Sequence, residues 1–217
     1  MISDKTALIK LLKNVILFSG GVILFLLGCV VYGIILNMRE KSLFEEMELK
    51  NLKELRNVHL VVYRSRNEVN LFSDTVLVKK YRAVFGRNSQ PKSKVNDRAT
   101  PIGEYRICRI DSNHIYHRFL KLNYPNLEDA TEGLRKKIVS QKEFDRLKFD
   151  YYYGECINDT TALGGNIGIH GIGQLDYVFK NLPFVFNWTN GSIAVSNENV
   201  DEILSVIKNG TKVIIKM

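Results

Sequence analysis

GGNIGIHGIGQLDYVFKNLPFVFNWTNGSIAVSN, residues 164–197, is the stretch of sequence that decides the fold. It contains two short apolar segments with glycine, IGIHG and NGSIAV, and each is typical of a strand end packed against other backbone. Each segment carries one reactive side chain, His170 in the first and Ser192 in the second. A histidine followed at long range by a nucleophile-type residue beside glycine indicates acyl transfer, in which a base activates the attacking atom.

Outward from this stretch, short apolar runs separated by turn residues predict a series of strands. A charged segment at 128–148 is expected to be helical, with a capping box of Ser140 and Glu143 opening a helix to about Lys148. Another helix is expected at 199–208 after a cap at Ser196 or Asn197. The domain from 58 to 217 is therefore expected to be mainly β with a few peripheral helices. The expected strands are residues 58–63, 68–72, 76–84, 104–110, 119–122 and 213–215.

An uncharged run at residues 15–36, VILFSGGVILFLLGCVVYGIIL, is long enough to cross a membrane as a helix. The sequence Asn-Met-Arg-Glu follows it, where a cleavable signal peptide would have a small-x-small site. We therefore expect an uncleaved transmembrane signal anchor, preceded by a cytoplasmic N-terminus at 1–14. Lysines and arginines flank the run on both sides, so the positive-inside rule does not set its orientation. Residues 37–57 alternate charged and apolar positions and predict an amphipathic stalk helix.

The three cysteines indicate neither a metal site nor a disulfide framework. Cys29 lies inside the apolar run and is interpreted as part of the spanning helix. Cys108 and Cys156 show no CxxC motif and no spacing typical of zinc ligands. We interpret them as small buried residues, although in an oxidising compartment they could pair. His59, among apolar strand positions, is interpreted as a packed or hydrogen-bonded histidine.

The composition limits the class of partner. The 217 residues have a formal net charge of +8 and 45% hydrophobic content, which fits a packed domain with a preference for acidic surfaces. Anionic lipid and wall polymers are both candidates. No nucleic-acid-binding motif accompanies the charge, so we expect no nucleic-acid partner, and no cofactor is expected.

The order of motifs carries a family resemblance. The part of the chain after residue 57 resembles the L,D-transpeptidase catalytic domain, the YkuD-like family of bacterial cell-wall enzymes. That resemblance implies a β-sandwich-like or barrel-like domain and a role in cell-wall biogenesis and cell shape. The motifs that carry it are the early hairpin, GRN at 86–88, DRATPIGEY at 97–105, LNYPN at 122–126, GIHG at 168–171 and WTNGSIAV at 188–195.

The resemblance also implies a chemistry. In this family a cysteine thiolate attacks the carbonyl between an L-centre and a D-centre of a peptidoglycan stem peptide, and an amine resolves the thioester. His170 matches the general base and Gly191 the residue before the nucleophile, while Ser192 occupies the cysteine position. A serine hydroxyl is a much weaker nucleophile than a thiolate without a well-placed base. Three explanations remain open: an engineered substitution, the native residue of a wall-binding pseudoenzyme, and a working serine hydrolase or slow transferase.

The remaining site residues follow from the same resemblance. Gly191 and the backbone around it are candidates for an oxyanion hole, supported by Thr189, Asn190 and Gly171. Asn190 stands where many family members have a histidine. The expected substrate contacts are Tyr124, Tyr152 and Trp188.

The expected partners are peptidoglycan stem peptides and, for some reactions of the family, a wall-linked lipoprotein. The expected location is the bacterial cytoplasmic membrane, with a single span and the domain either in the periplasm or at the outer surface. A non-catalytic wall-binding protein is the rival interpretation. Transpeptidase, carboxypeptidase, amidase and D-amino-acid exchange activities are not distinguished by the sequence.

Overall fold

The computed structural model describes residues 2–38, 40–154, 156–157, 160–181 and 186–217. The chain divides into two compact units. The first comprises Met1–Glu40 with Tyr177–Phe184, and the second comprises Lys41–Asp176 with Val185–Met217. All the strands and the candidate site belong to the second unit.

The first unit consists of helix α1 (Ile2–Asn37) and most of the short helix α5 (Asp176–Lys180). Within α1, Leu8–Ile35 is long and apolar enough to cross a membrane, and its apolar side chains are exposed all round. This helix contains the expected span at 15–36. A signal sequence meets the same criteria, so the helix indicates secretion or membrane anchoring.

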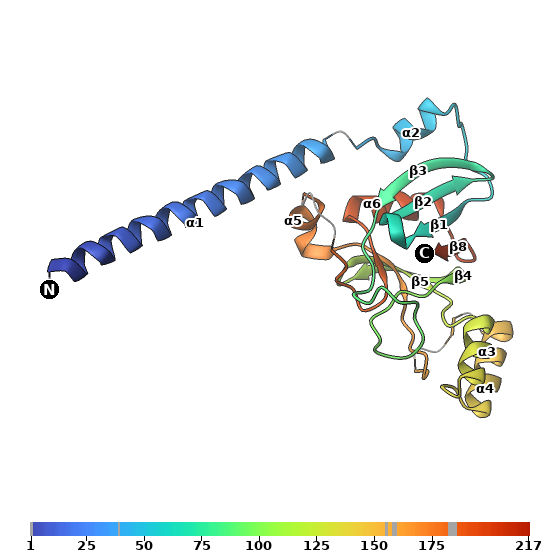
Figure 1. Ribbon diagram of the computed structural model, residues 1–217. Coiled ribbons are helices and arrows are strands. Elements are labelled where there is room, and N and C mark those ends of the chain that lie inside the picture. Colours follow the sequence, from blue (N-terminus) through green and yellow to red (C-terminus); the bar gives the residue numbers. More distant parts are fainter. Residues whose placement is uncertain (1, 39, 155, 158–159, 182–185) are drawn as a thin grey trace. The chain divides into compact units, whose positions relative to one another are not determined.

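The second unit is built on one mixed sheet of eight strands in the order β3-β2-β1-β8-β4-β5-β6-β7. Figure 1 labels strands β1 to β5 and β8 of this sheet. The β1–β8 and β6–β7 pairs are parallel and the others antiparallel. The six strands predicted from the sequence are all present, and the quoted stretch supplies β6 and β7. The strands are β1 (His59–Tyr63), β2 (Glu68–Ser73), β3 (Val76–Arg82), β4 (Gly103–His114), β5 (His117–Leu122), β6 (Gly168–His170), β7 (Ile193–Ala194) and β8 (Lys212–Lys216).

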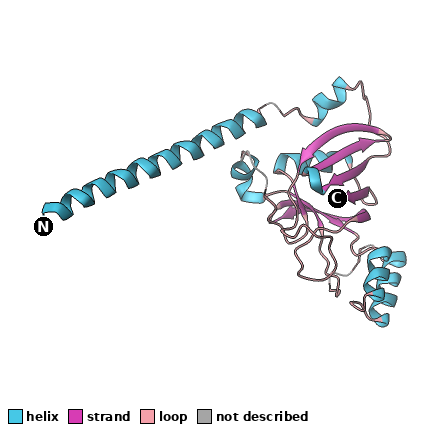
Figure 2. Ribbon diagram, viewed as in Figure 1, coloured by secondary structure: helices cyan, strands magenta, loops and turns pink. Residues whose placement is uncertain are grey.

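Strand β4 joins the two halves of this sheet. Its first four residues pair with β8 and its later residues with β5, and the register shifts between Ile107 and Arg109. The chain just after β3 returns to the far end of the sheet, because Val84 forms an isolated bridge to Ala194 in β7. The expected sandwich-like or barrel-like assembly is thus observed as a mixed sheet with helices beside it (Figure 2).

The helices begin where the sequence provides caps. Ser140 accepts a hydrogen bond from the Glu143 N–H at the start of α4, and Ser196 does the same for the Asn199 N–H of α6. Helix α4 runs on to Tyr153, beyond the predicted end at Lys148. The helices of this unit are α2 (Leu43–Leu49), α3 (Leu127–Arg135), α4 (Gln141–Tyr153) and α6 (Asn197–Val206), with 3-10 turns at Arg64–Arg66 and Gly173–Leu175.

The expected stalk helix over 37–57 is wrong in its length. The helix in this segment is α2, seven residues long, and it packs onto the domain. Leu43 is 6% exposed, and its N–H donates to Glu202 Oε1 at 2.9 Å. The other carboxylate oxygen of Glu202 lies 2.6 Å from Lys79 Nζ of β3. Leu43, Met47, Leu52 and Leu55 contact the core, because burying them on the sheet is more favourable than exposing them on a free stalk, whereas Phe44 and Leu49 are exposed.

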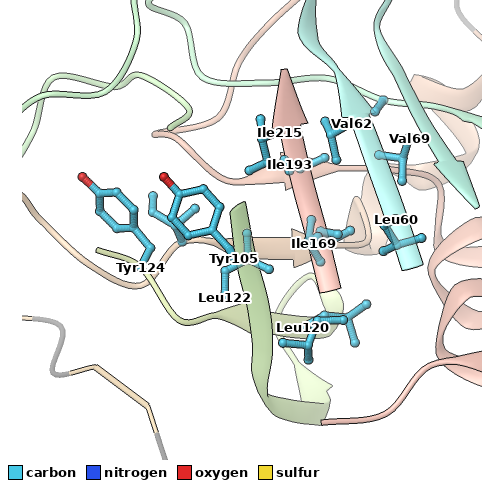
Figure 3. Packing of buried hydrophobic residues seen from close by; sticks show 14 of the residues in the cluster. Leu60, Val62, Val69, Tyr105, Leu120, Leu122, Tyr124, Ile169, Ile193 and Ile215 are labelled. Atoms are coloured by element: carbon cyan, nitrogen blue, oxygen red, sulfur yellow. The ribbon is translucent and has the colours of Figure 1, made fainter. Parts of the chain in front are cut away.

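Figure 3 shows the core between the two halves of the sheet. Ile169 of β6 and Ile193 of β7 point into this aliphatic cluster, and both are fully buried. Tyr105 and Tyr124 lie beside each other at its edge, with ring centroids 5.9 Å apart. Since successive residues of a strand face opposite sides, the neighbours of Ile169 and Ile193 point away from this core.

The preferred interpretation of Cys108 and Cys156 as separate buried residues is also wrong, and the pairing that the sequence left open is observed. They form a disulfide with a Cα–Cα distance of 5.4 Å, a normal value for such bonds. Cys108 lies at the register shift of β4, and Cys156 follows α4, so the bond encloses the α3–α4 hairpin. A separation of 48 residues hides such a pairing from local sequence patterns. Cys29 in α1 is a free thiol.

Candidate active site

The parallel pairing of β6 with β7 brings the two candidate residues together. His170 pairs with Ala194, and Ile169 pairs with Ile193. Because side chains alternate along each strand, His170 and Ser192 lie on the same face, opposite the core. Their offset along the paired strands is two residues, which sets them diagonally across adjacent strands. The sequence identified both residues, and the structure places them on one surface.

His170 is held as a neutral imidazole. It is 3% exposed, and its Nδ1 lies 2.6 Å from the carbonyl oxygen of Gly171. Burial lowers the pKa of His170 from 6.5 to about 4, and nearby His114 lowers it further, while the bond to Gly171 opposes the shift. A carbonyl can only accept, so Nδ1 carries the proton and Nε2 is the basic nitrogen. At neutral pH Nε2 of this imidazole is therefore unprotonated and free to accept a proton, although the low pKa makes it a weak base.

Aromatic rings surround this imidazole. Tyr116 stacks on it with a centroid distance of 4.8 Å, and Phe119 lies 6.1 Å away on the neighbouring strand β5. Trp188 meets it edge-on at 6.0 Å. These rings supply the burial that holds the imidazole neutral. Of these residues, the sequence identified only Trp188, and as a substrate contact.

Ser192 is half-buried, and its Oγ accepts a hydrogen bond from the Gly168 N–H at 3.2 Å. Within the described residues, no hydrogen bond joins Ser192 to His170. The serine hydroxyl is therefore oriented by the backbone of β6 and not by the base. Because the Oγ accepts this bond, its own O–H proton is not used by it and can be donated to Nε2 of His170 only when the two atoms come within hydrogen-bond distance.

The loop before Ser192 is organised by Thr189. Its hydroxyl donates to the Ser192 carbonyl at 2.6 Å and accepts from the Gly191 N–H at 3.2 Å. Gly191 has φ = 130°, which L side chains rarely adopt, and a Cβ there would lie 2.7 Å from Ala99 O. The Gly191 N–H is thus used inside the loop, which weakens its candidacy for an oxyanion hole. Asn190, next to it, is exposed.

Two expected substrate contacts lie elsewhere. Tyr124 is 1% exposed, and its hydroxyl donates to Leu163 O at 3.0 Å, so it is a core residue without a surface for substrate. This corrects the expectation for Tyr124, whose aromatic character reflects packing. Tyr152 is 59% exposed on α4, which lies with α3 at one end of the domain (Figure 1). Trp188, by contrast, contacts the His170 ring.

Sequence reasoning missed Tyr116, Phe119 and His114. His114 and Tyr116 lie beyond the predicted strands, at the end of β4 and in the hairpin turn. Phe119 begins a predicted strand, but its pairing with His170 is a contact between distant residues that the sequence does not show. Among the described residues, no group of three or more His, Cys, Asp or Glu side chains could hold a metal ion.

Comparison with known protein families identifies the domain that contains these residues. The L,D-transpeptidase catalytic domain model, YkuD, matches residues 57–215. The chain belongs to this family. The match covers β1 to β7 and β8 as far as Ile215, together with His170 and Ser192, so the site residues described above lie inside an L,D-transpeptidase domain.

Solved structures similar to this L,D-transpeptidase domain have low sequence identity. An L,D-transpeptidase from Xylanimonas cellulosilytica is 11% identical, with a TM-score of 0.45 over 76% of this chain and 62% of that one. The helical cell shape determining protein Pgp2 from Campylobacter jejuni is 19% identical, with a TM-score of 0.47 over 73% of this chain and 47% of that one. An L,D-transpeptidase from Mycobacterium smegmatis is 12% identical, with a TM-score of 0.43 over 74% and 59%.

This chain therefore spans less than two thirds of the length of these three structures. A comparison with curated proteins gives no match.

Proposed function

We infer that this protein acts on peptidoglycan stem peptides at the outer face of the bacterial cytoplasmic membrane, by acyl transfer through residue 192 with His170 as the base. The observation that carries the proposal is the placement of both side chains on one face of β6 and β7, within a domain of the L,D-transpeptidase family. The neutral state of His170, with Nδ1 bonded to Gly171 O, supports its role as base.

In this reaction the Ser192 Oγ attacks the carbonyl carbon of the peptide bond between an L-centre and a D-centre. Nε2 of His170 accepts the hydroxyl proton and then returns it to the leaving amine as the C–N bond breaks. An ester of Ser192 remains. An amine of another stem peptide, or water, then attacks this ester and releases the serine.

Two features support the outward-facing location. Helix α1 has a segment long and apolar enough to act as a membrane anchor. The Cys108–Cys156 disulfide fits an oxidising compartment, because cytosolic thiols are kept reduced. Together they favour a single-pass protein with residues 1–14 inside the cell and the domain outside.

A second function, stem-peptide binding without turnover, is favoured by the state of Ser192. Its hydroxyl is bonded to the Gly168 N–H, and the low pKa of His170 makes it a weak acceptor for a serine proton. A thiol loses its proton far more readily, so the same base would serve a cysteine better. The two functions therefore differ in one measurable step, formation of the acyl-enzyme.

Intact mass spectrometry of the full chain in detergent micelles, incubated with stem tetrapeptide, tests the proposal. Acyl transfer predicts an adduct on wild type that is lost in Ser192→Ala and His170→Ala. We expect Ser192→Cys to form the adduct at least about tenfold faster. Thr161→Ala, a change at a buried threonine outside the site, is the control.

The outcomes separate the two functions. An adduct on Ser192→Cys alone, with equal peptide affinity for wild type, identifies a binding protein that has lost turnover. If neither protein forms an adduct and neither binds the peptide, action on stem peptides is ruled out.

A further inference from the structure

The hairpin tip between β4 and β5 lies directly on the candidate base. The Tyr116 ring stacks on the His170 imidazole at 4.8 Å with 29° between the planes. Tyr116 is 36% exposed, whereas His170 is 3% exposed. Tyr116 also contacts Trp188, with ring centroids 6.1 Å apart. One face of this ring is therefore part of the cover that separates the imidazole from water.

The position of this hairpin tip is fixed by one carboxylate of the neighbouring helix α6. The Asp201 carboxylate of α6 forms hydrogen bonds with His117 Nε2 at 2.7 Å and with Arg118 Nε at 2.9 Å. Both partners directly follow Tyr116 in the chain. The arginine also donates a second hydrogen bond to Ser112 O, on the opposite arm of the hairpin. The tip is thus tied both to α6 and to itself.

The backbone of Gly171, next to His170, lies in close contact with the backbone of the hairpin tip. A Cβ added at Gly171 would lie 2.7 Å from Tyr116 O and 2.5 Å from Asn197 Oδ1, so only glycine fits there. Asn197 Oδ1 accepts from the Ile172 N–H at 3.0 Å and from the Gly173 N–H at 2.9 Å. Gly171 is the residue whose carbonyl orients Nδ1 of His170. The same short segment therefore sets both the tip and the tautomer of the base.

We propose that Tyr116 is a positioning residue for His170: its ring holds the imidazole plane so that Nδ1 donates to Gly171 O, and it keeps water off the ring. The inference rests on the proposed role of His170 as base. Phe119 also stacks on the imidazole, at 6.1 Å, and Trp188 meets it edge-on at 6.0 Å. Tyr116 lies nearer than either ring, at 4.8 Å, and unlike buried Phe119 it is 36% exposed. Its removal opens the site to solvent.

The titratable groups near His170 decide how its pKa should respond when Tyr116 is removed. His114 of β4 is the titratable neighbour that acts on it electrostatically, and it lies 5.5 Å from the Tyr116 ring. The side chains of His117 and Arg118 are both bonded to Asp201 of α6. Since burial is the largest cause of the low pKa of His170, admitting water moves that pKa upward.

The experiment is an NMR titration of the His170 imidazole in the full chain in detergent micelles, for wild type, Tyr116→Phe, Tyr116→Leu and Tyr116→Ala. With a pKa of about 4, about one tenth of the wild-type imidazole is protonated at pH 5. We expect Tyr116→Phe to match wild type and Tyr116→Ala to reach one half or more, about a fivefold rise. Tyr116→Leu, which covers without stacking, is expected to keep the imidazole neutral but to broaden or split its resonances as the ring reorients.

Tyr151→Ala is the matched control. Tyr151 has a similar exposed fraction, 40%, but lies on α4, so its removal should leave the titration of His170 unchanged. The proposal is overturned if Tyr116→Ala has the wild-type protonated fraction at pH 5, even if its melting temperature falls. It is also overturned if Tyr151→Ala raises that fraction equally. The titration needs no turnover, so it reads the role of Tyr116 even where the adduct experiment shows that acyl transfer is absent.

Discussion

Removal of the Cys108–Cys156 disulfide should destabilise the domain by about 4 kcal/mol. The bond closes a loop of 48 residues. The loop-closure relation, with an entropy of about −2.1 − 1.5R ln n cal/mol/K, gives about −13.6 cal/mol/K for n near 48 and about 4 kcal/mol at 25 °C. Both cysteines are half-buried, so their replacement by alanine loses little packing. The loss is therefore governed by the chain entropy of the unfolded state.

The double variant Cys108→Ala/Cys156→Ala is the perturbation, because either single variant leaves a free thiol. For a domain of this size, about 4 kcal/mol corresponds to a fall of about 8–16 °C in Tm. Urea unfolding of the full chain in micelles, followed by tryptophan fluorescence, measures the free energy directly. Trp188, the single tryptophan, lies beside His170 and reports on the site itself. Cys29→Ala, in α1, is the control and should leave both values unchanged.

Two results would refute this reasoning. A loss below about 1 kcal/mol would show that the loop is already restricted in the unfolded chain or that the bond does not form. Titration of the denatured, unreduced protein with a thiol reagent decides between these, because the disulfide predicts one reactive thiol and its absence predicts three. A limited proteolysis pattern unchanged within α3 and α4 would argue in the same direction, since the bond encloses that hairpin.

Further predictions concern the loop, the docked helix and pH. Thr189→Val should cost about 1–3 kcal/mol, because it leaves the buried Gly191 N–H without its acceptor, while Thr189→Ser should retain stability in the same urea titration. Glu202→Gln should cost about 3–5 kcal/mol by leaving Lys79 buried without its counter-charge, and adding Lys79→Met should recover part of that loss; equal stability of the single and double variants would contradict this. Burial raises the pKa of Asp129 from 3.8 to about 6, so its contribution to stability is present below pH 4 and is lost as the pH rises through 6. Asp129→Asn should therefore gain stability relative to wild type between pH 4.5 and pH 7.5, and a constant difference in urea midpoint would contradict the assignment.

Local patterns in the sequence were sufficient for much of the fold. Alternation of apolar residues predicted six strands, because a strand with one buried face requires that period wherever it lies in the sheet. The N-cap at Ser140 is confirmed, and Ser196 is the cap of the two residues considered, since a helix start is satisfied by a side chain within three residues. The capping box expected at Ser140 is only half formed, because the Glu143 side chain accepts from the Ala162 N–H instead. The apolar run at 15–36 was predicted to be helical and lies within α1, because the length and composition of a helix are local properties of the sequence.

The failures have one physical origin, which is contact between residues distant in the chain. The amphipathic pattern after residue 37 predicted a helix with an apolar face, but only the sheet domain decided that the helix packs against it. Glu202 holds it there by accepting hydrogen bonds from the Leu43 N–H and from Lys79. Tyr124 and Cys108 acquired their roles from partners at Leu163 and Cys156. No rule of spacing indicates such pairs.

The candidate site shows the same division. The sequence by itself determined which two segments carry reactive side chains, because glycine beside His170 and Ser192 marks close backbone packing. Only the tertiary structure decided their relation, since the parallel pairing of β6 with β7 sets their common face and the β4–β5 hairpin places Tyr116 on the base. The pKa of a histidine depends on how much water reaches it, and that is a property of the assembled domain.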